Sequence, residues 1–221
     1  MSFPIAVLAS GRGSNLAALI AARDGGALPI DFVLVAGDKP EAPALRNAEA
    51  HGFPTLALDA KSFATRREFD EALFARIAES GAKLVVLAGF MRVIDTTVVD
   101  AWAGRIINIH PSLLPKYRGL HTHRRALAEG DTEHGASVHF VTAELDGGPV
   151  IAQTRIAIQH DDDNEQTLAA RLLSQEHRLL VACVAAIAQD RVALREGTVM
   201  FDGQALAAPL RLDDADRLQH P

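Results

Sequence analysis

The first half of the chain alternates short apolar runs with longer segments in which apolar residues recur at helical spacing. Apolar runs bounded by turn residues predict buried strands, whereas periodic segments predict helices with one buried face. The predicted strands cover residues 5–9, 30–36, 55–58, 83–88 and 105–109, and the predicted helices cover 16–22, 41–51, 65–80 and 96–102. Strands that alternate with helices form right-handed βαβ units. The pattern therefore predicts an α/β fold with a mostly parallel central sheet flanked by helices.

The second half has a different pattern. A helix is expected over residues 122–129, and two β runs follow at 137–142 and 150–158, separated by a glycine-rich loop. Two runs joined in this way predict an antiparallel extension of the sheet. A long helix is expected over 165–189, capped by the polar residues 161–164.

The tail from Arg191 contains short β-like pieces and ends in a charged segment, 213–221, that we expect to be mobile. The chain has no internal repeat, no low-complexity tract and no change of composition typical of a linker. We therefore expect a single domain over 1–221, with an N-terminal half of about 1–100 and a C-terminal half of about 101–210.

Composition and charge narrow the classes of function. The net charge is −6 and no long Lys/Arg block offsets it, which argues against a nucleic-acid-binding surface. No apolar run approaches the roughly 20 residues of a membrane span, and the N-terminus lacks the pattern of a secretory signal. We therefore expect a cytoplasmic protein. Cys183 stands alone in an apolar run and is predicted to be a core residue instead of a nucleophile.

Candidate chemistry begins at the strand end over 106–110. Asn108 and His110 are two residues apart, so on an extended strand both side chains point to the same face. In a parallel sheet, ligands bind beyond the carboxyl ends of the strands, where the topology switches. The glycine turn at 10–15 and the turn at 89–92 follow two other predicted strands. These features should therefore lie near the same edge, and the loop that carries Asp146 could fold over it.

Asn108, His110 and Asp146 make chemical sense together. An Asn amide can donate to a developing oxyanion, which typically contributes about 10²–10³ in rate. His transfers protons near neutral pH, and an adjacent carboxylate orients it and favours its charged form. No hydroxyl or thiol is clearly placed as a nucleophile, because Ser112 follows Pro111 in a turn and is interpreted as structural. The set suits direct attack of an amine on a carbonyl, through a tetrahedral intermediate.

The turn over 10–15 joins a strand to a helix start, an arrangement that aims free backbone N–H groups at an anion. Ser14 or Asn15 can cap that helix, and both can donate to phosphate. The spacing is not that of the dinucleotide fingerprint or of a P-loop. A tight turn that simply needs two glycines is the alternative.

Purely structural interpretations exist for the candidate catalytic residues as well. A buried His is often a hydrogen-bonded core residue, and Asp-Gly-Gly is a common turn. A metal site is a further alternative, although His121-Thr122-His123 is not a His-Glu-x-x-His helix and no cysteine cluster joins it. The histidines that share this region are His110, His121, His123, His134 and His139.

Several segments resemble the folate-dependent formyltransferases, and together they cover nearly the whole chain. The Asn-x-His-Pro-Ser-Leu-Leu-Pro run at 108–115 is specific for that superfamily. The segments at 11–15 and 119–123 point to the branch that acts in purine synthesis. The other matching segments are 87–92, 116–117, 137–141, 145–150 and 175–177. The resemblance implies a Rossmann-like formyltransferase fold.

The resemblance also implies roles for individual residues. Asn108, His110 and Asp146 are similar to the catalytic residues of the family. The resemblance implies that the substrate is bound by Gly13, Ser14, Asn15, Arg66 and Glu176. Arg67 is the alternative to Arg66. The residues implied to line the folate pocket are Met91, Arg92, Val93, Ile94, Thr142, Ala143, Glu144 and Leu145. Arg118 stands where many members carry Pro, which puts only the stiffness of that loop in doubt.

The implied reaction transfers a formyl group from 10-formyltetrahydrofolate to the amine of glycinamide ribonucleotide. The folate is then a cosubstrate, with no tightly bound cofactor and no metal, and the partners are small molecules. The family contains both monomers and homodimers. The rivals are a formyltetrahydrofolate deformylase, a methionyl-tRNA formyltransferase and a non-catalytic nucleotide- or folate-binding module. A methionyl-tRNA formyltransferase is expected to carry a basic C-terminal domain, and the acidic charge of this chain disfavours it. A deformylase is expected to carry an N-terminal regulatory domain, whereas the first predicted strand here begins at residue 5. A non-catalytic module would not need the polar set Asn108, His110 and Asp146.

Overall fold

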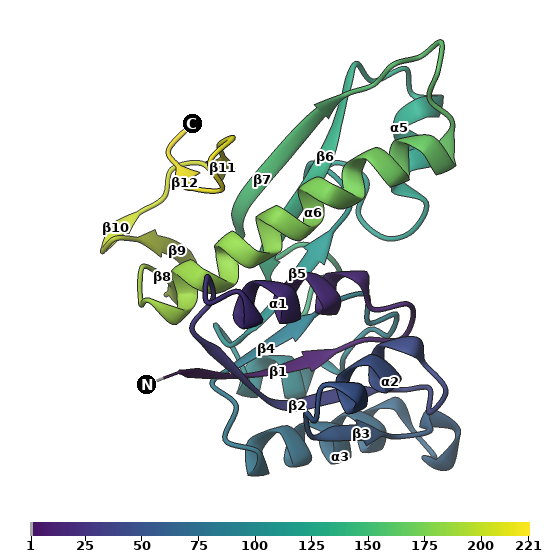
Figure 1. Cartoon of the computed structure of the whole chain (residues 1–221), viewed down its shortest axis with the longest axis vertical. Coiled ribbons are helices and arrows are strands. Elements are labelled where there is room, and N and C mark those ends of the chain that lie inside the picture. The colour runs from purple at the N-terminus through teal and green to yellow at the C-terminus, as the bar shows by residue number, and fades with distance from the viewer. Residues whose placement is uncertain (1) are drawn as a thin grey trace. The chain divides into compact units, whose positions relative to one another are not determined.

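The computed structural model describes residues 2–221 and separates into two compact units, one ending at Asn108 and the other starting at Ile109 (Figure 1). The chain passes from the first unit to the second within strand β5 (Ile106–His110). The boundary therefore falls between the two polar residues that the sequence singles out at this strand.

The first unit is built on a parallel sheet with the strand order β5-β4-β1-β2-β3. The chain starts in the middle at β1, proceeds outward to β3, and then crosses back to β4. The direction of winding thus reverses between β1 and β4, which is where ligands bind in folds of this class. The remaining strands are β1 (Phe3–Leu8), β2 (Ile30–Gly37), β3 (Thr55–Ala57) and β4 (Leu84–Leu87).

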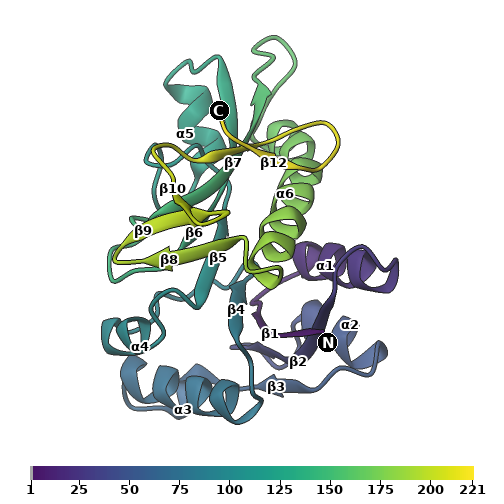
Figure 2. The same cartoon turned by 90° about the vertical axis from the view of Figure 1, so that its left-hand side faces the viewer.

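Helices flank this sheet as the alternation of the sequence predicts. Figure 2 shows α1 and α2 on one side of the sheet and α3 and α4 on the other. Helix α2 starts at residue 43, later than the predicted 41, because Pro43 occupies its first turn and holds Ala42 outside the helical region. The helices are α1 (Ser14–Asp24), α2 (Pro43–Ala50), α3 (Arg66–Glu79) and α4 (Thr96–Ala101), with a 3₁₀ turn at Ala60–Ser62.

The second unit contains the predicted antiparallel pair, β6 (Glu133–Phe140) and β7 (Val150–Ala157). Helix α6 (Glu165–Ala188) packs along both strands (Figure 1). Its start at Asn164 is a capping box, in which Asn164 and Thr167 satisfy each other's backbone N–H groups. Helix α5 (Thr122–Ala128) joins the core of this unit through Ala126.

Strand β6 begins at residue 133, earlier than the predicted 137. Its first residues pair with the far end of β7, from Glu133 opposite Ala157 onward. Polar residues and Gly135 conceal this part of the strand in the sequence. Gly135 is required there, because a Cβ would lie 2.1 Å from the carbonyl oxygen of Thr154.

The tail adds two small β elements to the second unit. Strands β8, β9 and β10 form a separate antiparallel sheet (Figure 2), while β11 pairs in parallel with β7 and antiparallel with β12. The bounds are β8 (Val192–Arg195), β9 (Thr198–Phe201), β10 (Gln204–Ala205), β11 (Leu210–Leu212) and β12 (Leu218–Gln219). The predicted fold class, a mostly parallel sheet with flanking helices and an antiparallel C-terminal extension, is confirmed.

Two expectations about individual segments can be compared with the structure directly. Cys183 is fully buried on α6, and burial raises the pKa of its thiol, so its position is that of a core residue. Within residues 2–221, every helix is too short or too polar to cross a membrane.

Candidate active site

The end of β5 places His110 in a buried position of the second unit. The ring is 6% exposed, and its Nε2 lies 2.9 Å from the carbonyl oxygen of Tyr117. Nδ1 lies 3.5 Å from Oδ2 of Asp146. Both ring nitrogens therefore face oxygen atoms, which fixes the plane of the imidazole. Asn108 precedes His110 on the same strand and is half-buried.

Asp146 reaches His110 from the loop between β6 and β7. Its backbone has φ 47°, a left-handed conformation that non-glycine residues seldom adopt outside functional or tightly constrained positions. The neighbouring Gly148 allows the loop to lie against β6, because a Cβ there would be 1.8 Å from the carbonyl oxygen of Phe140. The Gly119 N–H donates to Oδ2 of Asp146 at 2.8 Å. The carboxylate is thus held on the side facing His110.

A second histidine lies on the same carboxylate. Nε2 of His139, on β6, is 3.7 Å from Oδ1 of Asp146, and its Nδ1 is 2.9 Å from the carbonyl oxygen of Phe140. His139 is 2% exposed. The sequence analysis assigned it no role beyond a possible metal ligand. The sequence signal for a role of His139 at the site was its position in segment 137–141, which resembles the formyltransferases.

Burial acts on both members of the central pair, but it prevails only for His110. It lowers the pKa of His110, and this effect outweighs the Tyr117 carbonyl and the Asp146 charge, which both raise it. For Asp146, burial raises the pKa. Hydrogen bonds from His139 and from the Gly119 N–H, together with the nearby imidazoles, lower the pKa by more than burial raises it, so the net shift is downward. The resting pair is an ionised carboxylate beside a neutral imidazole. Asp146 does favour the charged form of His110, as expected of an adjacent carboxylate, but burial has the larger effect on the pKa.

The turn after β5 is held by hydrogen bonds between its own side chains and backbone. Ser112 is fully buried, its Oγ donates to the carbonyl oxygen of Lys116 at 2.6 Å, and its own carbonyl accepts from Oγ of Ser137 at 2.6 Å. These contacts agree with the interpretation of Ser112 as structural.

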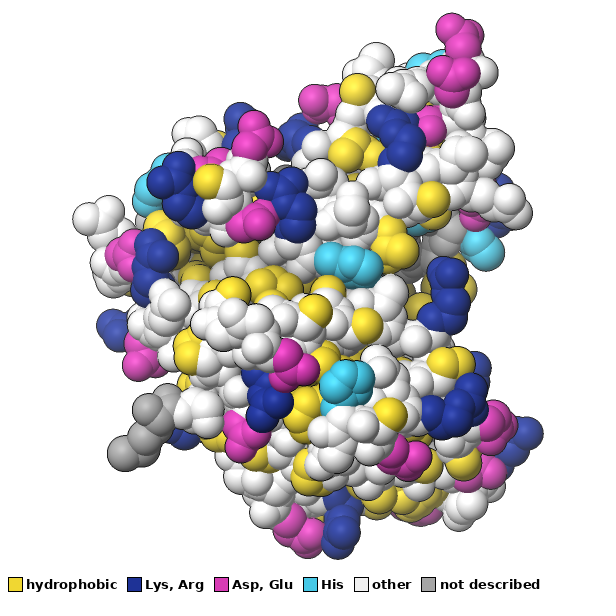
Figure 3. Space-filling model, in the orientation of Figure 1, with side chains coloured by type: hydrophobic (Ala, Val, Ile, Leu, Met, Phe, Trp, Pro, Cys, Tyr) yellow, Lys and Arg dark blue, Asp and Glu magenta, His cyan; other side chains and the backbone are white. Residues whose placement is uncertain are grey.

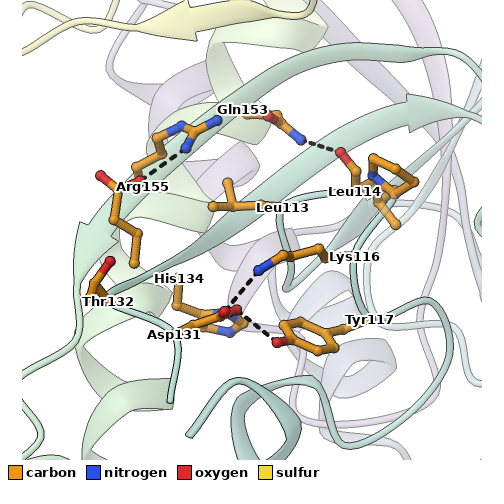
Figure 4. A pocket seen from close by; sticks show the side chains of 11 residues that line it. Leu113, Leu114, Lys116, Tyr117, Asp131, Thr132, His134, Gln153 and Arg155 are labelled. Atoms are coloured by element: carbon orange, nitrogen blue, oxygen red, sulfur yellow. Dashed lines mark hydrogen bonds and ion pairs between the residues drawn. The ribbon is translucent and has the colours of Figure 1, made fainter. Parts of the chain in front are cut away.

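A cavity of about 340 Å³ lies between this turn and strands β6 and β7. Figure 4 shows Lys116 and Tyr117 both pointing to Asp131, at 2.7 Å in each case. Arg155 pairs with Glu133 at 3.0 Å on the opposite wall. None of the residues predicted for catalysis or substrate binding lines this cavity. Its charged groups already balance one another, so we do not assign the reaction to it.

In the first unit, the glycine turn after β1 ends at Gly13, which caps α1 from the left-handed region with φ 78°. A Cβ at Gly13 would lie 2.7 Å from Cβ of Ala44, so this residue must be glycine for two reasons. The expected side-chain cap by Ser14 or Asn15 is wrong. Both residues lie inside the helix, and within the described chain no side chain caps it. The first N–H groups of α1 are consequently left for other partners.

Residues 88–95 connect β4 to α4 without regular secondary structure and are called segment 88–95 below. The segment lies beside the glycine turn, because the Ser10 N–H donates to the Gly89 carbonyl at 3.1 Å and the Met91 N–H donates to Oγ of Ser10 at 3.0 Å. Met91 is 71% exposed and Val93 is 48% exposed. Exposed apolar side chains on a backbone held in this way are typical of a ligand wall.

The doubled arginine occupies the start of α3. Arg66 is half-exposed, with Nη2 3.8 Å from Oδ2 of Asp95. Arg67 forms an i,i+4 pair with Glu71 at 2.7 Å, and this hydrogen bond raises the pKa of Arg67. The two arginines thus differ in their surroundings, since Arg67 already has a short contact and Arg66 has a long one.

The other predicted binding residues lie in the second unit. Thr142 is half-buried, whereas Ala143, Glu144 and Leu145 are exposed on the loop that ends at Asp146. Glu144 forms an ion pair with Arg118. Glu176 lies on α6 and is 8% exposed.

The clustered histidines do not form a metal centre in the part of the chain that the structure describes, where no three His, Cys, Asp or Glu side chains are arranged to hold an ion. Two of them pair instead, with Nε2 of His134 3.0 Å from Nδ1 of His123. On the face shown in Figure 3, acidic and basic side chains are interspersed.

A model of the formyl transferase family matches residues 4–184. The phosphoribosylglycinamide formyltransferase of Escherichia coli is 45% identical over 91% of this chain and 95% of its own length. The chain belongs to the formyl transferase family. The solved structure of phosphoribosylglycinamide formyltransferase from Coxiella burnetii superposes with a TM-score of 0.89 at 42% identity, covering 94% of this chain and 97% of that one. The human trifunctional purine biosynthetic protein adenosine-3 is 38% identical over 87% of this chain, which corresponds to 19% of the human protein.

Membership of the formyl transferase family confirms the resemblance stated from the sequence motifs. It gives the contacts of the second unit a chemical context, because formyl transfer passes through a tetrahedral centre on which negative charge develops. An amide, an imidazole and a carboxylate are groups suited to that charge and to the accompanying proton transfer.

Proposed function

We propose that this chain transfers the formyl group of 10-formyltetrahydrofolate to the amine of glycinamide ribonucleotide, as part of purine synthesis. The observation that carries the catalytic assignment is the buried contact between His110 and Asp146, 3.5 Å apart, in a member of the formyl transferase family. The name and length of its bacterial relative support this choice of acceptor.

In the proposed reaction, the substrate amine attacks the formyl carbon directly. A bond forms between that nitrogen and carbon, and the bond from carbon to N10 of the folate then breaks. Asn108 donates its amide N–H to the formyl oxygen as negative charge develops there. The net proton transfer runs from the attacking amine to N10, so no proton is gained or lost overall.

His110 is proposed to carry that proton between the two nitrogens. Its pKa is lowered by burial, so the resting imidazole is neutral and can accept a proton. The new positive charge is stabilised by Asp146, whose own pKa is depressed despite its burial. The imidazolium formed in this way also stabilises the oxyanion. His110 therefore becomes charged during the reaction and not before it.

The ribonucleotide phosphate is assigned to Gly13, Ser14, Asn15 and Arg66. The N-terminus of α1 supports this assignment, because its first N–H groups have no side-chain cap within residues 2–221. Arg67 remains the alternative to Arg66. Glu176 is assigned to the ribose or glycinamide part of the substrate, where a carboxylate can accept from hydroxyl or amine groups.

The formyl donor is assigned to two groups of residues. Met91, Arg92, Val93 and Ile94 contribute from segment 88–95, and the exposure of Met91 and Val93 supports this role. The second group, in the loop that carries Asp146, is Thr142, Ala143, Glu144 and Leu145. The donor is consumed in each turnover, so it is a cosubstrate and not a tightly held cofactor. We further propose that the protein is cytoplasmic and works as a monomer or homodimer.

The test is the release of tetrahydrofolate, followed by absorbance with purified protein and both substrates. Release that depends on glycinamide ribonucleotide is the expected result. Absence of ribonucleotide-dependent release would contradict the proposal. Equal hydrolysis of the formyl donor with and without ribonucleotide would identify a deformylase instead.

A further inference from the structure

Segment 88–95 has no strand or helix of its own, so side chains from elsewhere must hold its backbone. Ser10 fixes the beginning of the segment through its contacts with Gly89 and Met91. The end of the segment is fixed by Asp70 of α3, whose Oδ2 accepts the N–H of Asp95 at 2.7 Å. The segment is therefore anchored near both of its ends.

Asp70 is an unusual residue for its position. It is 0% exposed and lies on the buried face of α3 beside Phe69 and Leu73. Burying a carboxyl group costs free energy, and among residues 2–221 only the hydrogen bond from the Asp95 N–H offsets part of that cost. An apolar residue would satisfy the helix pattern better. A buried carboxyl group at such a place calls for a role other than packing.

Arg92 of the segment supplies the opposite charge. Its guanidinium lies 4.8 Å from the ring centre of Phe69, the residue before Asp70. Among the described residues, Oδ1 of Asp70 and Nε of Arg92 are both buried without a hydrogen-bond partner. Burial raises the pKa of Asp70, and the Asp95 N–H and the charges of Arg92 and Arg66 only partly offset it, so the net shift is upward. Asp70 therefore acts on the segment chiefly through its hydrogen bond to the Asp95 N–H.

The side chains of the segment alternate between solvent and interior. Met91 and Val93 are exposed, Arg92 is half-buried, and Ile94 is 5% exposed. The inward-facing side chains of Arg92 and Ile94 thus alternate with the outward-facing Met91 and Val93. Holding the Asp95 backbone at the end of the segment therefore helps to set the direction in which Met91 and Val93 point.

We propose that Asp70 is a positioning residue for the formyl donor, which holds segment 88–95 so that Met91 and Val93 form a fixed apolar wall. The proposal rests on the proposed function, because it takes the donor to be the ligand of this wall. Asp70 itself does not touch the donor. Preorganised walls bind more tightly because less conformational entropy is lost when the ligand arrives.

The experiment compares Asp70→Ala and Asp70→Asn with the wild-type chain. Calorimetry measures the Kd of tetrahydrofolate, and steady-state kinetics give the KM of each substrate. We expect Asp70→Ala to weaken tetrahydrofolate binding and raise the donor KM by about tenfold, equivalent to about 1.4 kcal/mol. The ribonucleotide KM should change by less than about twofold. Asp70→Asn retains an oxygen that accepts from the Asp95 N–H, so it should recover part of the affinity.

A control must separate positioning from loss of stability. Ile77 is fully buried further along α3, and Ile77→Ala removes packing without removing the hydrogen bond to Asp95. We expect Ile77→Ala to lower the Tm and to leave the Kd of tetrahydrofolate unchanged. A double substitution with Arg92→Gln adds a second readout, since the effects of Asp70→Ala and Arg92→Gln should be less than additive if they act together.

Three results would overturn the proposal. The first is an unchanged donor KM and Kd in both Asp70 variants. The second is an equal loss of affinity in Ile77→Ala at the same loss of Tm, because Asp70 would then act only through stability. The third is a rise in the ribonucleotide KM alone. A wild-type chain that binds no tetrahydrofolate would overturn the proposed function as well, so the two failures are distinguishable.

Discussion

Asp146 and His110 lie 3.5 Å apart between Oδ2 and Nδ1, as an ionised carboxylate beside an imidazole that burial keeps neutral. The arrangement is suited to stabilising a proton that arrives during the reaction. An imidazole that was already charged could not accept it. The contact between these two residues is therefore the first to test by substitution.

Asp146→Asn should leave the protein folded and lower turnover by several orders of magnitude. The amide is nearly the same size as the carboxylate, but it carries no charge to stabilise the imidazolium of His110. Turnover is measured with both substrates at saturation, and folding by the Tm. Near-wild-type turnover in this variant would remove Asp146 from the mechanism.

Stability should rise with pH between about 4 and 6.5. Burial, helped by the neighbouring His123, lowers the pKa of His134 from 6.5 to about 4. In that range, the unfolded chain binds a proton at this histidine and the folded chain does not, so acidification favours unfolding. Urea denaturation at pH 4.5 and pH 7 measures the difference. The His134→Gln variant should show a smaller dependence on pH, and an equal dependence would assign the effect to other groups.

Arg66→Ala should raise the ribonucleotide KM while changing kcat little. Its guanidinium has a long contact of 3.8 Å with Asp95, so it can turn to the substrate phosphate. Arg67→Ala is the matched control, since Arg67 is adjacent and already pairs with Glu71. The assignment is off by one residue if Arg67→Ala raises the KM and Arg66→Ala does not.

Gly13→Ala should lower stability and raise the ribonucleotide KM together. The new Cβ would lie 2.7 Å from Cβ of Ala44, and the backbone has φ 78°. Gly26→Ala separates these causes, because Gly26 has φ 77° but no atom within 4 Å of the added Cβ. Gly26→Ala should show the backbone strain alone, of about 1 kcal/mol, with the KM unchanged. A similar KM rise in both variants would argue against a phosphate site at Gly13.

Local patterns predicted most of the secondary structure. Helix α3 illustrates the reason, since Thr65 caps its start, Gly81 follows its end, and its apolar residues recur at helical spacing. The start of β6 was missed because the residues there are polar and are held in the strand by pairing with β7. The cap of α1 was misassigned because a left-handed glycine, not a side chain, begins that helix.

The candidate site was predictable to a different degree in each part. Asn108, His110 and Asp146 could be proposed as catalytic residues from residue type and motif. The backbone groups that hold them, the Tyr117 carbonyl and the Gly119 N–H, carry no sequence signal because every residue has such groups. His139 was visible in the sequence, but its contact with Asp146 depends on how the loop folds back on β6.

The α/β alternation, the family and the chemical types at the site could be inferred from the sequence, because they follow from local periodicity and from side-chain chemistry. Which groups are buried together depends on the tertiary structure. Burial lowers the pKa of His110 although the charge of Asp146 raises it. The packing of α3 brings the carboxyl group of Asp70 to the backbone of segment 88–95. Desolvation depends on everything that surrounds a group, so it cannot be inferred from the neighbours of that group along the chain.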